Sequence, residues 1–300
     1  MPLHRITSID VAVPDVAAAS AFYAAFGLID DGDGWFVTRD GGRQLRLVPA
    51  PRRGLRRLGL AAGSPDDLDR IARSLAALDI DVAHDRRSDE CLVLTEPATG
   101  LPIELEVAAP VQAAGVLPSP VANRPGDAPR RGRPADGVRR TEPVRPSNLT
   151  HLVLGTPDFA TTLGVLTDGL GLEISDQLPG VIAFTRAGEV HHTVAVQAAP
   201  GPQLHRVAYE VDDADEVGRG VGAAHGRSRP SRVGHGAPRH RLQRVLVPAR
   251  PGRQLRRVHG RRRPHRRRRL PPRTVAGPPV PLQLGAAATG EFLEPSDWQD

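Results

Sequence analysis

The feature that most constrains this chain is an internal repeat. A strand-like segment that ends in a Pro-Asp pair occurs near the start, at Pro14-Asp15, and returns at Pro157-Asp158. In each copy a helix-like segment follows and ends near a Gly-Leu pair, first Gly27-Leu28 and later Gly171-Leu172. Self-similarity over a long period indicates a duplicated architecture, so the repeat outweighs any single motif.

The first copy reads as strands and helices in a fixed order. Residues 6–13 alternate between apolar and polar, as expected of a half-buried strand. Asp15 then suits the N-cap of a helix over 16–26, and Ser64 suits the N-cap of a second helix. Short strand-like segments complete the copy: 34–38, 44–48, 55–61, 91–95 and 102–107. This order predicts an α+β fold of tandem βαβββ modules, with the second module incomplete.

The pattern divides the 300 residues into five parts. We expect 1–109 to be a structural first module and 147–220 to be the second module, which carries the functional residues. Between them, 110–146 is rich in Pro, Gly and Arg and predicts a solvated linker. After residue 220 the strand and helix pattern stops, so we expect 221–289 to be disordered and 290–300 to be a short tail.

Composition excludes several classes of protein. The single cysteine, Cys91, rules out a disulfide framework and a cysteine-based zinc cluster. No apolar run reaches the length of about 18 residues that a membrane-spanning helix needs. Residues 1–9 lack the charged-then-apolar pattern of a signal peptide. We therefore expect a cytoplasmic protein with no membrane partner.

The net charge of +6 combines two opposite parts of the chain. All 40 basic residues are arginine, because the chain contains no lysine. Eighteen of them lie in 221–289, which contains no Asp or Glu, so the rest carries 22 arginines against 34 acids. The body is therefore acidic, and the positive net charge does not by itself indicate a nucleic-acid partner.

Segments of the second copy carry a family resemblance. The first reads Leu-Thr-His-Leu-Val-Leu-Gly-Thr-Pro-Asp over 149–158, followed by Thr-Asp-Gly-Leu-Gly over 167–171. The second reads Glu-Val-His-His-Thr-Val-Ala over 189–195, followed by Pro-Gly-Pro-Gln-Leu-His-Arg-Val-Ala-Tyr-Glu-Val over 200–211. They resemble the catalytic half of two-domain extradiol (catechol ring-cleaving) dioxygenases of the vicinal-oxygen-chelate superfamily, whose paired modules form a cupped sheet.

The resemblance implies a metal-dependent reaction on a small catecholic aromatic and O2. Its cofactor would be Fe(II), or sometimes Mn(II), held by two histidines and one glutamate that leave positions open for both substrates. His151 falls on the first metal-ligand position. His192 falls on the acid–base position, which suits an imidazole because it exchanges protons near neutral pH. Adjacent strand residues face opposite sides, so only one of His191 and His192 can face inward.

At the second metal-ligand position the sequence departs from the family. The family places there the second histidine of a Leu-His-His-Val run, whereas this chain has Leu204-His205-Arg206-Val207. Arg206 is cationic and has no lone pair to donate to a metal. His205 is the remaining candidate ligand on this strand, although strand alternation should turn it to the other side. We therefore expect the metal site to be impaired.

The first copy offers no replacement set of ligands. Ser8 stands at the position that corresponds to His151, and Glu104 and Glu106 near the end of the copy have no histidine beside them. This agrees with a structural role for the first module.

We interpret the arginine-rich segment as translation in a different reading frame of GC-rich DNA. Residues 221–289 contain no Asp, Glu, Asn, Lys, Phe, Tyr, Trp, Ile or Met. Codons can be chosen for 241–259 whose second frame reads Gly-Ser-Asn-Val-Phe-Trp-Tyr-Leu-Arg-Asp-Pro-Ala-Gly-Asn-Phe-Val-Glu-Tyr, like the closing strands of the family. The metal-binding glutamate of that reading straddles the codons of Arg257 and Val258. The original frame returns near Gly290, where 291–297 again resembles a family C-terminus.

Two other functions stay open. A metal-free small-molecule-binding protein of the same superfamily would use the cupped sheet without the chemistry, but the second copy supplies few aromatic side chains: Phe159, Phe184 and Tyr209. A nucleic-acid binder would act through 227–273, which lacks interleaved aromatic residues, so we expect no specific nucleic-acid partner. A homo-oligomeric assembly also stays open.

Overall fold

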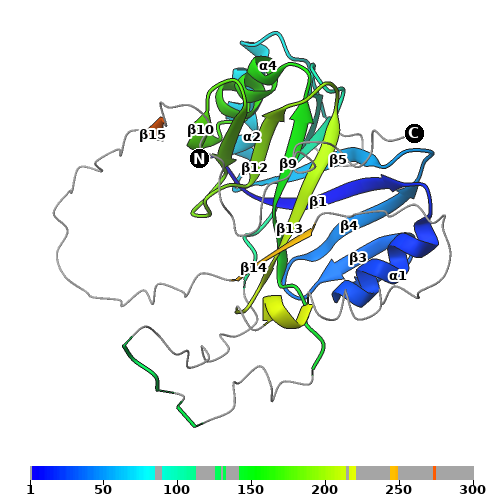
Figure 1. Cartoon of the computed structure of the whole chain (residues 1–300). Helices are drawn as coiled ribbons and strands as arrows, with labels where there is room; N and C mark the ends of the chain where they lie inside the picture. Colours follow the sequence, from blue (N-terminus) through cyan, green and yellow to red (C-terminus); the bar gives the residue numbers. More distant parts are fainter. Residues whose placement is uncertain are drawn as a thin grey trace.

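The computed structural model describes residues 2–84, 90–112, 126–129, 131–132, 142–213, 216–220, 244–248 and 273–274. These residues form two β-sheets, one from each copy, that lie next to each other (Figure 1). No helix within this part of the chain is both long enough and apolar enough to cross a membrane.

The first sheet contains eight strands in the spatial order β2-β3-β4-β1-β5-β8-β7-β6. Its elements are β1 (Leu3–Val13), α1 (Val16–Phe26), β2 (Ile29–Asp30), β3 (Trp35–Thr38), β4 (Gly42–Pro49), β5 (Gly54–Ala62), α2 (Pro65–Ala76), β6 (Val82–His84), β7 (Cys91–Thr95) and β8 (Pro102–Val107). The central strand β1 runs parallel to β4 and antiparallel to β5, which in turn runs parallel to β8.

This sheet consists of two βαβββ units. The first unit is β1-α1-β2-β3-β4 and the second is β5-α2-β6-β7-β8. The predicted α+β class and βαβββ order are confirmed, but the sequence pattern assigned only one unit to each copy. The number of units differs because the sequence pattern does not reveal β2 and β6. With two and three residues, these strands are too short to show an alternating pattern.

The second sheet has the order β14-β13-β9-β12-β11-β10-β15. Its elements are β9 (Asn148–Thr156), α4 (Phe159–Gly164), the π-helix η1 (Val165–Gly169), β10 (Glu173–Leu178), β11 (Ile182–Arg186), β12 (Val194–Ala198), β13 (Gln203–Val211), β14 (Arg244–Pro248) and β15 (Arg273–Thr274). β9 takes the place of β1, because it runs parallel to β12 and antiparallel to β13. A third βαβββ unit is therefore complete, and β13 begins a fourth.

Two short strands lie where the sequence predicted no regular structure. β14 pairs in parallel with β13, as β8 does with β5, and β15 pairs with β10. These two strands are the part of 221–289 that the structure describes, and the assignment of the whole segment stays a prediction. An open sheet edge offers backbone N–H and C=O groups to any extended segment, whatever its side chains. The rest of 221–289, all of 290–300 and most of 110–146 lie outside the described residues.

Both helices that follow a Pro-Asp pair begin as predicted. Asp15 Oδ1 accepts a hydrogen bond from the backbone N–H of Ala18 at 2.8 Å, and Asp158 Oδ1 accepts one from the N–H of Thr161 at 3.0 Å. Gly27 ends α1 with a φ of 109°, in the left-handed region that favours glycine. These local signals therefore place both helices correctly relative to the central strands.

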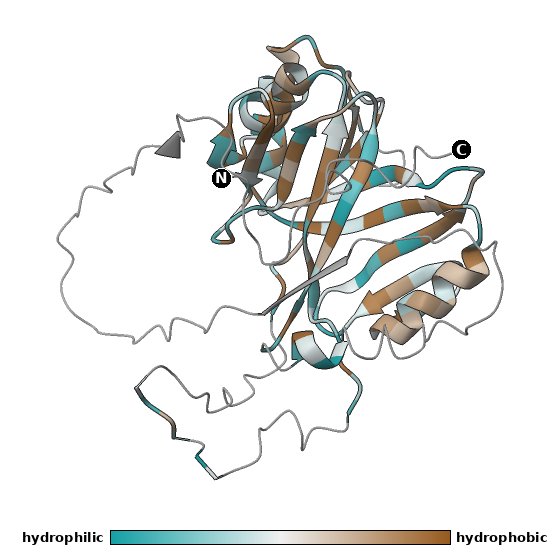
Figure 2. Cartoon of the chain, viewed as in Figure 1, coloured by the Kyte–Doolittle hydropathy of each residue, from teal (hydrophilic) through white to brown (hydrophobic). Residues whose placement is uncertain are grey.

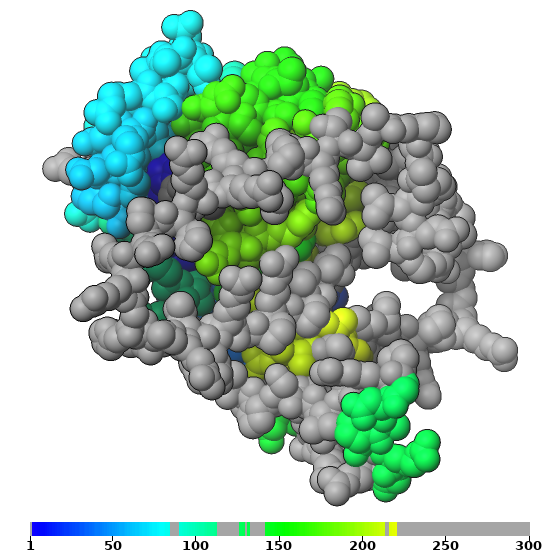
Figure 3. Space-filling view, turned by 90° about the vertical axis from the view of Figure 1, so that its left-hand side faces the viewer, coloured from blue at the N-terminus to red at the C-terminus, as the bar shows by residue number. Residues whose placement is uncertain are grey.

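The buried apolar side chains of the two copies form one hydrophobic core. Banded brown and teal strands in Figure 2 show apolar residues alternating with polar ones along both sheets. In Figure 3 the cyan second half of the first copy adjoins the green start of the second. A Cβ on Gly169 of η1 would lie 2.7 Å from Cδ2 of Leu75 in α2, so the glycine permits this close packing. Val144 and Pro146, at the end of the segment predicted as a linker, are buried as well.

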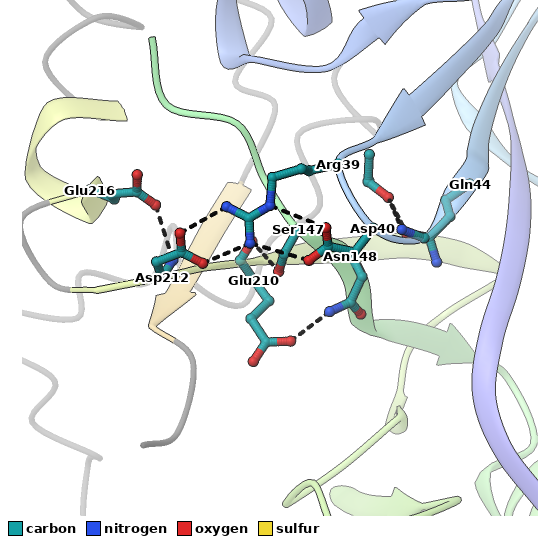
Figure 4. A network of polar contacts seen from close by, with 10 residues as sticks. Arg39, Asp40, Gln44, Ser147, Asn148, Glu210, Asp212 and Glu216 are labelled. Atoms are coloured by element: carbon teal, nitrogen blue, oxygen red, sulfur yellow. Dashed lines mark hydrogen bonds and ion pairs between the residues drawn. The ribbon is translucent and has the colours of Figure 1, made fainter. Parts of the chain in front are cut away.

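An ion pair links the turn after β3 to the residue after β13 (Figure 4). Arg39 Nη1 and Nη2 lie 2.8 Å from the two carboxylate oxygens of Asp212, and Arg39 also contacts Asp40. A planar guanidinium matches a carboxylate in this two-bond geometry. The hydrogen bonds to Asp212 and Asp40 raise the pKa of Arg39 above its usual value.

Gln44 connects the two sheets through the buried interior. Its side chain is fully buried on β4. Gln44 Oε1 accepts hydrogen bonds from the Leu149 N–H at 2.7 Å and from the Thr38 hydroxyl at 2.7 Å. Its Nε2 donates to the Ile6 carbonyl at 3.3 Å. One amide thus satisfies polar groups on β1, β3 and β9.

Replacing Gln44 should therefore weaken the contact between the sheets. We expect Gln44→Leu to lower the free energy of unfolding by about 1–3 kcal/mol, because it leaves the buried Leu149 N–H without an acceptor. Urea unfolding of the full chain measures this change. The control Thr38→Val removes one donor to Gln44 but keeps the Leu149 hydrogen bond, so it should cost less. Equal losses for the two variants would contradict this account.

Candidate functional site

Neighbouring strands of the second sheet bring the candidate residues together. His151 lies on the central strand β9, Arg206 on its antiparallel neighbour β13, and His192 just before its parallel neighbour β12. Strands on both sides enclose β9, and His151 is only 9% exposed. We call His151, His192 and Arg206 the second-copy site.

His151 and His192 lie ring against ring. Their centroids are 3.9 Å apart with an interplanar angle of 46°. Phe184 on β11 contacts His192 edge to face, with centroids 5.1 Å apart. His191 points instead toward β10, where its Nε2 lies 2.6 Å from Oδ2 of Asp176. The structure thus places His192 rather than His191 beside His151.

Both inner imidazoles are neutral at pH 7. Burial lowers the pKa of His151 to about 4, and the positive charge of Arg206 contributes to this shift. Burial also lowers the pKa of His192 to about 3, with smaller contributions from His151, His191 and Arg206. Neutral imidazoles keep a lone pair that can accept a proton or bind a metal.

Arg206, the residue at the second metal-ligand position that the resemblance implies, lies on the strand next to His151. It pairs with Val153, two residues from His151, and its charge acts on both inner imidazoles. Burial lowers its pKa, as expected for a cation removed from water. A guanidinium has no lone pair for a metal and repels a divalent cation. This position therefore opposes metal binding.

His205 lies one residue earlier on the same strand. The register of β13 on β9 shifts between Leu204 and Arg206, which puts His205 at an irregularity of the β-bulge type. Within the described part of the chain, no three His, Cys, Asp or Glu side chains form a group that could hold a metal. The assignment of His151 and His205 to one metal ion stays a prediction, and the described residues supply no third ligand for it.

The third ligand position lacks a carboxylate in the described structure. On the first sheet Glu104 of β8 opposes Gly59 of β5; on the second, Val245 of β14 opposes Ala208 of β13. Two neutral imidazoles favour a metal, but a guanidinium stands where the family resemblance implies the second histidine, and among the described residues no set of three ligating side chains forms. The residues described therefore do not fit the implied Fe(II) or Mn(II).

Sequence reasoning missed two residues that matter here. Asp176 contacts His191 across the sheet, and no local pattern signals that pairing. Arg57 of the first copy occupies the same place as Arg206. The signal for it was present, because Leu55-Arg56-Arg57-Leu58 repeats the spacing of Leu204-His205-Arg206-Val207.

Comparison with known sequences identifies relatives of this chain. No protein-family model matches it. It is 30% identical over 237 residues to metapyrocatechase 2 of Cupriavidus necator, a match that covers 73% of this chain and 70% of that protein. A shorter match, 37% identical over 79 residues, is to biphenyl-2,3-diol 1,2-dioxygenase of Metapseudomonas furukawaii and covers 23% of this chain and 26% of that enzyme.

Solved structures share the fold. A Mn(II)-bound glyoxalase from Novosphingobium aromaticivorans is 25% identical, with a TM-score of 0.58 over 75% of this chain and 71% of that one. A halotolerant catechol dioxygenase is 17% identical, with a TM-score of 0.58 over 75% of this chain and 76% of that one. Homoprotocatechuate 2,3-dioxygenase from Brevibacterium fuscum, in complex with 3,4-dihydroxyphenylacetate, is 18% identical. Its TM-score is 0.55, over 76% of this chain and 70% of that one.

The chain belongs to the extradiol catechol dioxygenase family of the vicinal-oxygen-chelate superfamily. The match to metapyrocatechase 2 spans more than two thirds of both proteins and confirms the resemblance seen in the sequence.

The buried imidazoles predict a pH-dependent stability. In the folded chain the pKa values of His151 and His192 are about 4 and about 3, whereas the ordinary value is 6.5. At a pH between the lowered pKa values and 6.5, the unfolded chain binds more protons than the folded chain. The free energy of unfolding should therefore fall as pH drops below 6.5 and level off above it. Urea unfolding at pH 5 and pH 7 measures the slope.

The double variant His151→Asn/His192→Asn should lose this part of the pH dependence, because neither amide titrates. If the variant and the parent show the same slope, other groups cause it.

Proposed function

We propose that this chain is an extradiol-type, ring-cleaving dioxygenase for catecholic aromatics whose metal-dependent activity is impaired in the sequence as it stands. Family membership supports the activity class. His151 and His192 support it further, because they occupy the first-ligand and acid–base positions of the resemblance and contact each other. We infer the impairment from the positive charge of Arg206, which acts on these two neutral imidazoles.

His192 can still act on a catechol hydroxyl. It is neutral at pH 7 and is the inner member of the His191-His192 pair. Its lowered pKa makes it a weak base when the site is empty of anions. A negative charge that develops on the catechol oxygen would raise the pKa of His192 and so favour the proton transfer.

We propose in addition that the missing carboxylate is encoded in another reading frame of 221–289. The composition of this segment and the family-like second-frame reading of 241–259 support the proposal. Reading the coding DNA tests it directly. A DNA sequence whose second frame yields no family-like string at this place would rule it out.

Repair of both ligand positions should restore metal binding. As it stands, the chain should retain little Fe(II) after gel filtration, because in the part of the chain that the structure describes His151 and His192 lie beside a cation and no carboxylate joins them. Arg206→His together with the corrected frame should yield about one iron per chain, because three protein ligands fix the geometry and leave sites for catechol and O2. Metal analysis and the absorbance of yellow ring-opened products measure the two effects.

Arg206→Met with the corrected frame is the matched control, since it removes the charge without adding a ligand and should remain poor in iron. Stoichiometric iron in the unaltered chain would contradict the proposed impairment.

The repaired protein also tests the role of His192. His192→Ala should keep the iron but lose about 10²–10⁴-fold in turnover, the usual contribution of an acid–base group. Asp176→Asn is the control, because Asp176 contacts His191 rather than His192, and it should leave most turnover intact. Equal losses from the two variants would mean that His192 has no separate role in proton transfer.

A metal-free small-molecule-binding protein of the same superfamily is the second candidate. The guanidinium of Arg206 beside two neutral imidazoles favours it, since such a set can hydrogen-bond an oxygen-rich ligand without a metal. A repaired protein that folds and loads iron, yet is inert toward every catechol tried, would favour this candidate over the dioxygenase.

A further inference from the structure

Strand pairing shows which residue of the first copy stands in the place of Arg206. β1 and β9 are the central strands of their sheets, and β5 and β13 are their antiparallel neighbours. Asp10 of β1 pairs with Arg57 of β5, and Val153 of β9 pairs with Arg206 of β13. Arg57 is therefore the counterpart of Arg206.

The other two ligand positions also have counterparts in the first copy. Ser8 precedes Asp10 by two residues, as His151 precedes Val153. Glu104 lies on β8, the strand that runs parallel to β5 on its far side from β1. The first copy thus has serine, arginine and glutamate where the family resemblance implies histidine, histidine and glutamate. We call Ser8, Arg57 and Glu104, with the adjacent Asp10, the first-copy site.

The guanidinium of Arg57 lies at the centre of the first-copy site. Its Nη1 donates to Oε2 of Glu104 at 2.8 Å, and its Nη2 donates to Oδ1 of Asp10 at 2.9 Å and to Oγ of Ser8 at 2.9 Å. The Arg57 side chain is only 16% exposed. One cation therefore joins β1, β5 and β8 through three oxygen atoms.

The two arginines differ in the charges that surround them. Burial lowers the pKa of Arg57, but the hydrogen bond and charge of Asp10 and the charge of Glu104 outweigh burial and raise it. Burial lowers the pKa of Arg206. Val153 stands in the second copy where Asp10 stands in the first. The first-copy site is thus built for a positive charge.

The backbone beside Arg57 is shaped to admit the guanidinium. A Cβ on Gly59 would lie 3.2 Å from Arg57 Nη1 and 2.4 Å from the hydroxyl oxygen of Thr7. The second copy has Ala208 at the corresponding place, two residues after Arg206. Glycine at this position leaves the space that the head group of Arg57 occupies.

We propose that the first-copy site is a cation site at the three metal-ligand positions of the fold, and that the guanidinium of Arg57 is the cation it binds. The partly buried carboxylates of Asp10 and Glu104 need a positive partner. A guanidinium on the same chain supplies that charge without any metal. The charges of the first-copy site are then balanced without a bound ion. This inference does not rest on any activity of the second copy.

The first test removes the guanidinium from the full chain. Arg57→Met should lower the urea concentration at the unfolding midpoint, because the carboxylates of Asp10 and Glu104 then lie together without a counter-charge. Adding Asp10→Asn and Glu104→Gln to that variant should recover most of the loss. Arg43→Met is the control, because its partner Asp31 is about as exposed as Arg43 itself and the pair should contribute little. An Arg57→Met chain as stable as the parent overturns the proposal.

The second test exchanges the internal cation for a metal ion. Ser8→His/Arg57→His leaves two imidazoles and Glu104 at the three positions. It is made in a chain that also carries His151→Ala/His192→Ala, so that the second-copy site cannot contribute. This chain should bind Mn(II) about tenfold or more tightly than the same chain with Ser8 and Arg57 intact, by electron paramagnetic resonance of free Mn(II). Glu104→Gln should abolish the gain; a folded chain that gains nothing overturns the proposal.

A third variant covers the case in which the histidine pair does not fold. In Arg57→Gly the carboxylates and the space remain while the guanidinium is gone. Guanidinium ion at non-denaturing concentration should then raise the thermal unfolding midpoint, and sodium ion at the same concentration should not. The absence of any difference between the two ions overturns the proposal.

Discussion

Both sheets are organised around a central strand that pairs with one parallel and one antiparallel neighbour. β1 lies between β4 and β5, and β9 lies between β12 and β13. A shift of one residue in this register would turn every side chain on the strand to the other face. The same pairing therefore fixes the position of Arg57 beside Asp10, of Arg206 beside Val153, and of His151 within reach of His192.

The two copies differ chemically in the groups that surround a buried charge. A cation taken out of water is costly unless carboxylates or strong acceptors surround it. The first copy meets this condition, since Arg57 contacts two carboxylates and a hydroxyl. In the second copy burial lowers the pKa of both inner imidazoles, with a smaller contribution from the charge of Arg206, and that same charge would repel a divalent metal. Among the described residues, the second-copy site therefore has two imidazoles and no carboxylate, whereas the first-copy site has two carboxylates and no imidazole.

The first copy also supports the second mechanically. Glu96, which is 1% exposed, accepts hydrogen bonds from the Thr162 hydroxyl of α4 at 3.1 Å and from the backbone N–H groups of Ala98 and Thr99. At another point of the contact, Arg39 of the first copy binds Asp212 of the second. These contacts hold α4 and the end of β13 relative to the first sheet, and β13 carries Arg206.

The sequence by itself determined the duplication, the α+β class, the helix starts at Asp15 and Asp158, the family, and the departure from its ligand pattern at Arg206. Each of these depends on a local pattern or on the chemistry of a single side chain. The tertiary structure decided that each copy is made of more than one βαβββ unit, and that His192 rather than His191 meets His151. It also showed that Arg57, which the sequence reading passed over, binds Asp10 and Glu104. These features depend on pairing between strands far apart in the chain, and long-range packing sets that register, which no local pattern encodes.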